Sequence, residues 1–203
     1  MDFRTIGLAV MVSAAAAAQQ RLTVGVYNLA GVPEAVLDKA RGEAGRIFAK
    51  AGVEAEWVEC DASRADRSAA CAGMGQPDRP VVKIMTRSVD GQRSRGALGY
   101  AVVPEAGVFG TQAWVFFASV KETAARDGVD DPDVLAVTMA HELGHLLLGQ
   151  NAHSGRGVMQ GTWKKEQLKR AASGGFTFTR EQGEKMQAQV SERAQATVVA
   201  RTR

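Results

Sequence analysis

Residues 141–145 read HELGH, and they lie inside an apolar run that ends at Leu148. On an α-helix, residues four positions apart lie one turn apart on the same face, so His141 and His145 would stand side by side. Two imidazoles at this spacing can bind one Zn²⁺, and Glu142 can reach a water on that metal. The alternative is a buried helix with locally hydrogen-bonded histidines, but it leaves a glutamate without a partner among Leu and Met side chains. The pentapeptide therefore predicts a central helix that binds a metal.

The remaining histidine follows closely. The chain has three histidines, and His153 completes the set within thirteen residues of His141. Gly149 lies between the second and third histidines, where a glycine can end the helix and turn the chain back. We therefore expect His141, His145 and His153 to hold one Zn²⁺.

The segments around this helix predict an α/β fold. Asp131 suits the helix N-cap, with Pro132 at the first helical position. Upstream, alternating or continuous apolar segments are typical of strands, and a segment of helical period lies between the first two. Thr179 and Gln182 form a capping box before a last helix. The order is β-α-β-β-β-β-α followed by a loop and a C-terminal helix, which predicts a mixed, twisted sheet. The expected strands are 22–30, 53–59, 80–86, 97–103 and 112–120, and the expected further helices are 33–50 and 163–172.

Composition describes an ordinary globular domain. The chain has 203 residues, of which 45% are hydrophobic and 23% are charged, which excludes wholesale disorder and allows one domain with a core. The net charge is +3, and the basic residues are scattered among acidic ones along the chain. The basic cluster at 164–170 reads more readily as a solvated helix face than as a nucleic-acid site, so no nucleic-acid partner is expected.

The N-terminus has the features of a secretory signal peptide over residues 1–18. Arg4 supplies the positive charge, a short apolar segment follows, and three alanines precede Gln19. No later stretch is apolar enough to span a membrane, and no cysteine after the cleavage region indicates a lipid anchor. We therefore expect a secreted or periplasmic protein with a single domain over residues 19–203.

Cys60 and Cys71 are the two cysteines of the chain. An even count in an exported protein favours a disulfide between them. A metal site built on the two thiolates is the competing interpretation, but the spacing is wrong for zinc and no histidine is nearby.

Residues 141–159, HELGHLLLGQNAHSGRGVM, resemble the active site of the metzincin-type zinc metalloproteases. That family carries H-E-x-x-H-x-x-G-x-x-H followed by a methionine in a tight turn under the metal. The resemblance implies a zincin-like α+β fold. It implies His141, His145 and His153 as zinc ligands, Glu142 as general base and Met159 as the methionine of the turn.

The spacing departs from the family pattern. The family's glycine would stand at Leu148, and here Gly149 is one residue later. The family's third histidine would stand at Asn151, and here His153 is two residues later. We expect a slightly longer helix and a wider turn. Met159 could instead be an ordinary core residue, since methionine commonly fills gaps.

The family's substrate pairs with an edge strand, which by resemblance implicates Gly99, Tyr100, Ala101 and Val102. Tyr100 is more readily an edge-strand aromatic than a group that polarises a substrate carbonyl. The resemblance thus implies a zinc-dependent endopeptidase acting on peptide or protein substrates, and with the signal peptide we expect a secreted enzyme that is a monomer. A metal-activated water would attack the peptide bond, and Glu142 would accept its proton and return it to the leaving amine.

Two other interpretations stay open. Glu166, on an expected helix, could replace His153 as third ligand. Alternatively, the chain could be a non-catalytic secreted module that binds zinc for structure. Glu142 argues against the second, because a structural site normally uses four protein ligands and needs no adjacent carboxylate.

Overall fold

The computed structural model of the chain describes residues 20–61, 69–87, 96–105 and 107–202. The expected signal peptide, residues 1–18, lies outside these ranges. The strands are β1 Gln20–Asn28, β2 Val53–Glu59, β3 Val81–Met85, β4 Gly99–Ala101 and β5 Gln112–Phe116. The helices are α1 Glu34–Lys50, α2 Phe117–Asp127, α3 Asp131–Leu148, α4 Lys165–Ala172 and α5 Arg180–Arg201, with a 3₁₀ turn η1 at Ala69–Cys71.

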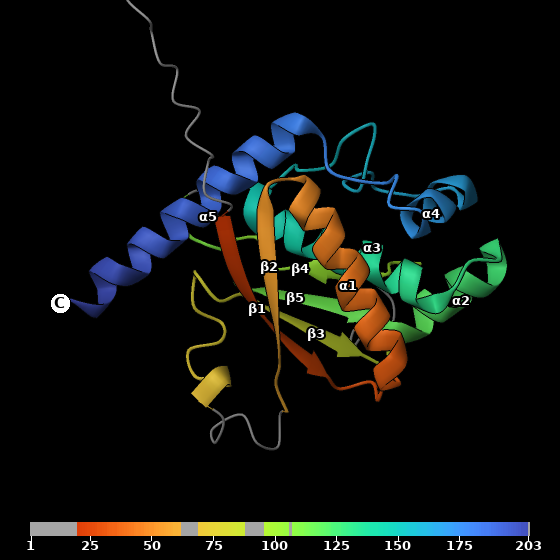
Figure 1. Cartoon of the computed structure of the whole chain (residues 1–203), viewed down its shortest axis with the longest axis horizontal. Coiled ribbons are helices and arrows are strands. Elements are labelled where there is room, and N and C mark those ends of the chain that lie inside the picture. The colour runs from red at the N-terminus through yellow and green to blue at the C-terminus, as the bar shows by residue number, and fades with distance from the viewer. Residues whose placement is uncertain (1–19, 62–68, 88–95, 106, 203) are drawn as a thin grey trace, which may run out of the picture.

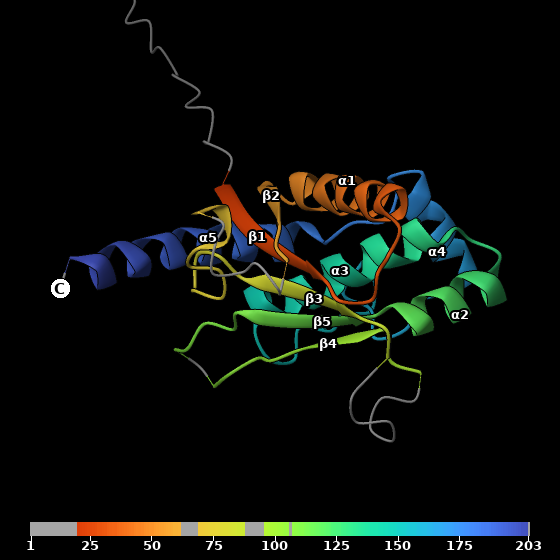
Figure 2. The ribbon, with the colours of Figure 1, turned by 90° about the horizontal axis from the view of Figure 1, so that it is seen from below.

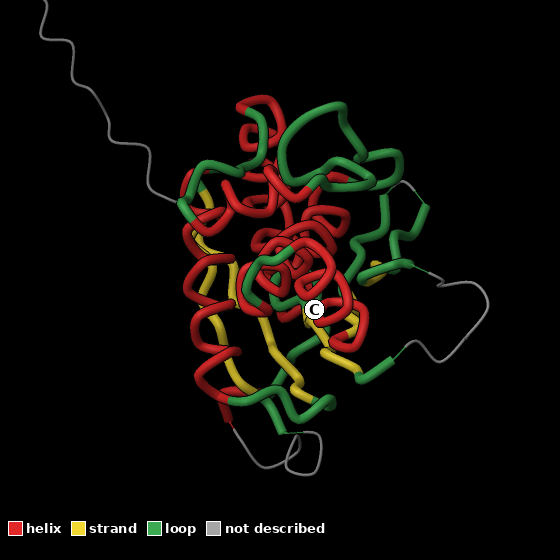
Figure 3. The backbone as a smooth tube through the Cα atoms, turned by 90° about the vertical axis from the view of Figure 1, so that its right-hand side faces the viewer, coloured by secondary structure: helices red, strands yellow, loops and turns green. Residues whose placement is uncertain are grey.

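The five strands form one sheet in the order β2-β1-β3-β5-β4. The strands β2, β1, β3 and β5 are parallel, and β4 pairs antiparallel with β5 at the edge. This arrangement confirms the expected mixed α/β sheet. Figure 2 shows α1 and α3 side by side on one face of the sheet, and in Figure 3 the strands curve around the central helices.

The core lies between the sheet and these helices. Along β1, Leu22, Val24 and Val26 alternate toward the helices and are almost completely buried. They meet a cluster that includes Leu37 and Phe48 of α1. Burial also covers nearly the whole circumference of α3, so this helix runs through the middle of the domain, as its uniformly apolar sequence predicts.

One expected strand was too long. The apolar segment 112–120 predicts a strand throughout, but β5 ends at Phe116 and the chain continues as α2. Val120 and Ala124, one helical turn apart, are both buried, and Gly128 ends the helix at φ 61°. The sequence did not predict α2 because only its first residues belong to the apolar run. Most of the helix lies in the polar segment that follows, where a helical pattern of apolar residues is hard to recognise.

Two local predictions are confirmed. Cys60 and Cys71 form a disulfide with an S–S distance of 2.04 Å, which joins the end of β2 to η1. The capping box at α5 is present, with the Gln182 amide donating to Thr179 Oγ1 at 3.2 Å. Figure 1 shows α5 crossing one end of the sheet and extending beyond it. In the described ranges, every helix is too short or too polar to traverse a lipid bilayer.

Candidate metal centre

The three histidines meet at one point. The Nε2 atoms of His141 and His145 are 3.1 Å apart, those of His145 and His153 are 3.2 Å apart, and those of His141 and His153 are 3.3 Å apart. Ligands placed tetrahedrally at zinc–nitrogen distances of about 2.0–2.1 Å stand about 3.3 Å from one another. The three imidazoles therefore fit one zinc ion. Within the described ranges, they are the only group of three or more His, Cys, Asp or Glu side chains so placed.

The hydrogen bonding of His141 supports this assignment. Its Nδ1 lies 2.8 Å from the backbone oxygen of Val158. A carbonyl oxygen only accepts, so Nδ1 carries the proton and the Nε2 lone pair faces the other two histidines. Burial lowers the pKa of His141, and burial with the two neighbouring imidazoles lowers the pKa of His145 to about 4. Both side chains are thus neutral at neutral pH, the form that binds a metal.

A two-step turn brings His153 to the centre. Gly149 ends α3, its N–H donating to the oxygen of His145 at 3.0 Å. Its φ is 83°, as a turning glycine predicts, but its ψ of −165° is extended rather than left-handed. Asn151 takes the left-handed conformation instead, with φ 58°. The side chain of Asn151 is exposed and lies outside the histidine group, as does that of Glu166 on α4.

Met159 lies under α3 in a turn closed by a hydrogen bond from the Gln160 amide to the Gly157 oxygen, 3.2 Å long. The methionine is fully buried. A Cβ atom on Gly144, between the two helical histidines, would lie 2.6 Å from the Met159 sulfur and 2.9 Å from the Phe178 ring. Gly144 thus leaves the space that Met159 and Phe178 fill. Sequence reasoning missed this role, although a glycine inside a helix costs about 1 kcal/mol relative to alanine and so indicates a packing requirement.

Glu142 is buried beneath the edge strand. Only 6% of its surface is exposed, and this burial raises the pKa of its carboxyl to about 8. A cation on the adjacent histidines would favour the carboxylate and lower that pKa. A Cβ atom on Gly99 would lie 2.8 Å from the Glu142 Cγ, so β4 passes directly over this side chain.

The edge strand β4 spans Gly99–Ala101, shorter than the expected strand 97–103, and it holds three of the four residues Gly99–Val102 that the resemblance implicates. The amide of Val102, just beyond it, still donates to the Gln112 oxygen of the neighbouring segment. In an antiparallel pair, backbone groups alternate between the partner and the open edge. Val102 bonds inward, so Gly99 and Ala101 direct their N–H and C=O groups toward the open edge. Tyr100 stacks on Trp114 with ring centroids 4.6 Å apart, on the opposite face from Glu142.

A cleft of about 500 Å³ joins these parts. The three histidines and Glu142 line it together with β4, with Arg126 of α2 and with Trp163 and Leu168 at or before α4. The arrangement can bind a metal at the base of an open groove and place a carboxyl group beside it.

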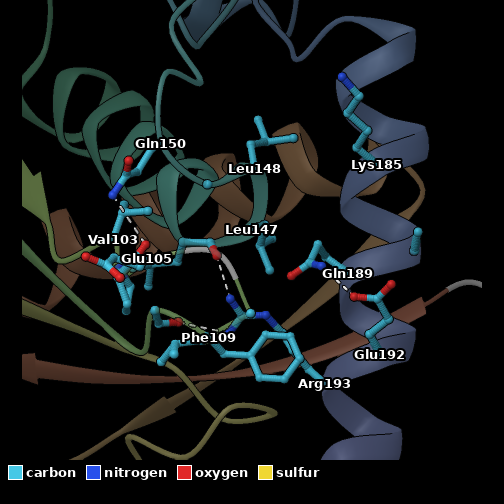
Figure 4. Close-up of a pocket in the computed structure, with 17 residues that line it drawn as sticks. Val103, Glu105, Phe109, Leu147, Leu148, Gln150, Lys185, Gln189, Glu192 and Arg193 are labelled. Atoms are coloured by element: carbon cyan, nitrogen blue, oxygen red, sulfur yellow. Dashed lines mark hydrogen bonds between the residues drawn. The ribbon is translucent and has the colours of Figure 1, made fainter.

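A larger pocket, of about 750 Å³, lies away from the histidines between α5 and residues 103–105 and 107–110 (Figure 4). Arg193, a residue only 1% exposed, borders it with its guanidinium. This group donates to the oxygens of Pro77 and Gly110 at 2.8 and 2.9 Å and to that of Leu146 near the end of α3. Burial lowers the pKa of Arg193 to about 10, and the side chain remains charged at neutral pH. Arg193 therefore ties α5 to three segments, including the helix that carries two histidines.

Comparison with known proteins gives a likeness of fold. No protein-family model matches the sequence, and no curated protein matches it. The chain is similar in structure to metalloproteinase-II from Bacteroides fragilis, with a TM-score of 0.51 and 13% sequence identity. The similarity covers 84% of this chain and 53% of the other, so this chain spans about half the length of the solved protein that it matches.

Proposed function

We propose that the chain is a secreted zinc-dependent endopeptidase of the metzincin type, with residues 19–203 as its single catalytic domain. The main support is the convergence of His141, His145 and His153 within 3.1–3.3 Å, beside the buried Glu142. The similarity of its fold to a bacterial metalloproteinase agrees with this proposal.

The three histidines would hold the zinc through Nε2, and the Val158 oxygen would keep His141 in the required tautomer. When bound, zinc supplies a Lewis acid that makes a water nucleophilic at neutral pH and polarises a carbonyl oxygen. Glu142 would accept the proton released by the attacking water and pass it to the leaving amine. Its buried position, beside the histidines and beneath β4, keeps bulk water from competing for that proton.

The substrate would be an extended peptide lying along β4. The backbone groups of Gly99 and Ala101 face the open edge and would pair with it by β-augmentation. Because Gly99 has no side chain, the strand can lie close above Glu142. Tyr100 and Val102 would support this edge, Tyr100 through its stacking on Trp114.

The experiment combines metal analysis with peptide hydrolysis. Purified protein should contain about one zinc per chain and should lose hydrolytic activity to strong chelators. Glu142→Gln keeps the size of the side chain but removes the base, so zinc should stay bound while turnover falls by at least about 10²-fold. The matched control is Glu166→Gln, which changes an exposed glutamate outside the histidine group.

The outcomes separate the remaining interpretations. Zinc binding without hydrolysis in the unchanged protein would support a non-catalytic zinc module. Loss of zinc in Glu166→Gln would make Glu166 a ligand and contradict the metzincin assignment. Near-normal turnover in Glu142→Gln would remove Glu142 from the mechanism.

The proposed export agrees with the Cys60–Cys71 disulfide, since such bonds persist mainly outside the cytoplasm. Expression of the full chain in a bacterium should give a periplasmic or culture-medium form that begins at Gln19. Recovery of the whole chain in the cytoplasm, with Met1 retained, would contradict it.

A further inference from the structure

Trp163 lies between the Met159 turn and α4, and its indole faces the candidate metal centre. Indole has one N–H donor and no lone pair suited to a metal, so Trp163 is not a ligand. The ring is nevertheless half-buried against His141 and forms part of the cleft wall. Two different contacts join Trp163 to this histidine.

The first contact is polar and passes through one carbonyl. Trp163 Nε1 donates to the Val158 oxygen at 3.1 Å, and His141 Nδ1 donates to the same oxygen at 2.8 Å. A carbonyl oxygen has two lone pairs, so these two donors use both. Trp163 therefore holds the peptide group of Val158 in the orientation that His141 requires.

The second contact is between rings. The centroids of Trp163 and His141 are 5.2 Å apart with planes at 83°, an edge-to-face arrangement. Trp163 meets Phe176 in a similar way at 6.5 Å and 87°. The indole thus packs against both Phe176 and His141, and its contact with His141 restricts rotation of the imidazole about the Cβ–Cγ bond.

We infer that Trp163 is a positioning residue of the metal centre. Through the Val158 oxygen and through ring packing, it holds His141 with Nε2 directed at His145 and His153. Partners of metal ligands fix the tautomer and orientation of those ligands, and losing them typically weakens metal binding about 10–100-fold. Trp163 contacts both the partner, which is the Val158 oxygen, and the proposed ligand His141. The inference rests on the proposed function in that zinc is the ion bound.

Two substitutions separate the two contacts. Trp163→Phe keeps an aromatic ring but removes the N–H group, and we expect zinc binding to weaken about 3–10-fold. Trp163→Leu removes both contacts, and we expect a loss of about 10–100-fold. Competition with a chromophoric chelator gives the zinc dissociation constant. The visible absorption bands of the Co²⁺-substituted protein report ligand geometry and should shift in both variants.

The control is Trp57→Phe in β2, at the opposite edge of the sheet. Trp57 Nε1 is buried and forms no hydrogen bond, so this substitution removes an indole N–H without removing a hydrogen bond. Zinc affinity and the Co²⁺ spectrum should match those of the unchanged protein.

A second readout does not depend on zinc. In metal-free protein, nuclear magnetic resonance of the His141 Nδ1 proton should show faster exchange with water in Trp163→Phe than in Trp57→Phe. Equal zinc affinity, equal Co²⁺ spectra and equal exchange in the Trp163 variants would overturn the inference. If the unchanged protein binds no zinc, the proposed function fails at that point, and the proton exchange still decides whether Trp163 positions His141.

Discussion

At the scale of single residues, the spacing between His145 and His153 is the feature that separates this site from the family pattern. The sequence predicts the ligand types and a turning glycine, because imidazole chemistry and helix termination are local properties. It does not predict that Gly149 is extended at ψ −165° while Asn151 is left-handed at φ 58°. Those angles depend on how the loop packs under α3, which no single residue determines.

The turn itself can be tested with two substitutions. His153→Ala removes one of three converging nitrogens, so zinc binding should fall strongly and activity should be lost. Asn151→Ala removes only an exposed amide, and zinc should remain bound, although the left-handed backbone costs alanine about 1 kcal/mol of stability. Zinc content measured by mass spectrometry of native protein distinguishes the two. Zinc retained in His153→Ala would show that another side chain completes the site.

At the scale of elements, α3 combines a face that carries His141 and His145 of the candidate metal centre with a packing face. Its length and burial follow from the apolar sequence, and the structure agrees with that prediction from Asp131 to Leu148. The position of Gly144 above Met159 and Phe178 is a tertiary contact between distant segments, and helical periodicity carries no information about it. The start of α2 was missed for a different, local reason, because the apolar residues of β5 continue into the helix without a break.

Gly144→Ala tests this contact. Alanine is a better helix former, yet its Cβ atom would enter the space of the Met159 sulfur and the Phe178 ring. We expect a loss of about 1–3 kcal/mol in the free energy of unfolding, measured by denaturant titration. Gly42→Ala is the control, because Gly42 is an exposed glycine of α1 with no atom near the added carbon. It should gain about 0.5–1 kcal/mol. A gain in stability at both positions would mean that Met159 and Phe178 move aside for the new methyl group without loss of stability.

At the scale of the whole molecule, Arg193 connects parts of the chain that the sequence gives no reason to associate. Its hydrogen-bond acceptors are the backbone oxygens of Pro77, Gly110 and Leu146. Every residue has a backbone oxygen, so the sequence does not indicate which of them Arg193 contacts. The sequence therefore predicts the sheet, the central helix and the last helix, but not the hydrogen bonds by which Arg193 joins the last helix to the end of the central helix and to two loops. Burying a charged group also costs free energy, which the charge-assisted hydrogen bonds offset.

Arg193→Met keeps most of the apolar volume but leaves buried carbonyl oxygens without donors. The free energy of unfolding should fall by about 3–5 kcal/mol, with a clear drop in the thermal midpoint. Arg180→Met on the same helix is the control, since the Arg180 side chain is 92% exposed. It should change stability by no more than about 0.5 kcal/mol. Equal effects of the two substitutions would show that Arg193 does not stabilise the fold through these bonds.

The hydrogen bond between Arg193 and Leu146 can form only after both residues have been synthesised. The two residues are 47 positions apart, and Arg193 is made after all three histidines. At about 5–20 residues per second, a ribosome needs roughly 2–9 s to add that stretch. Throughout that interval the last turn of α3 has no guanidinium to hold its carbonyl. His141, His145 and His153 are thus synthesised several seconds before the arginine that hydrogen-bonds to the end of the helix carrying two of them.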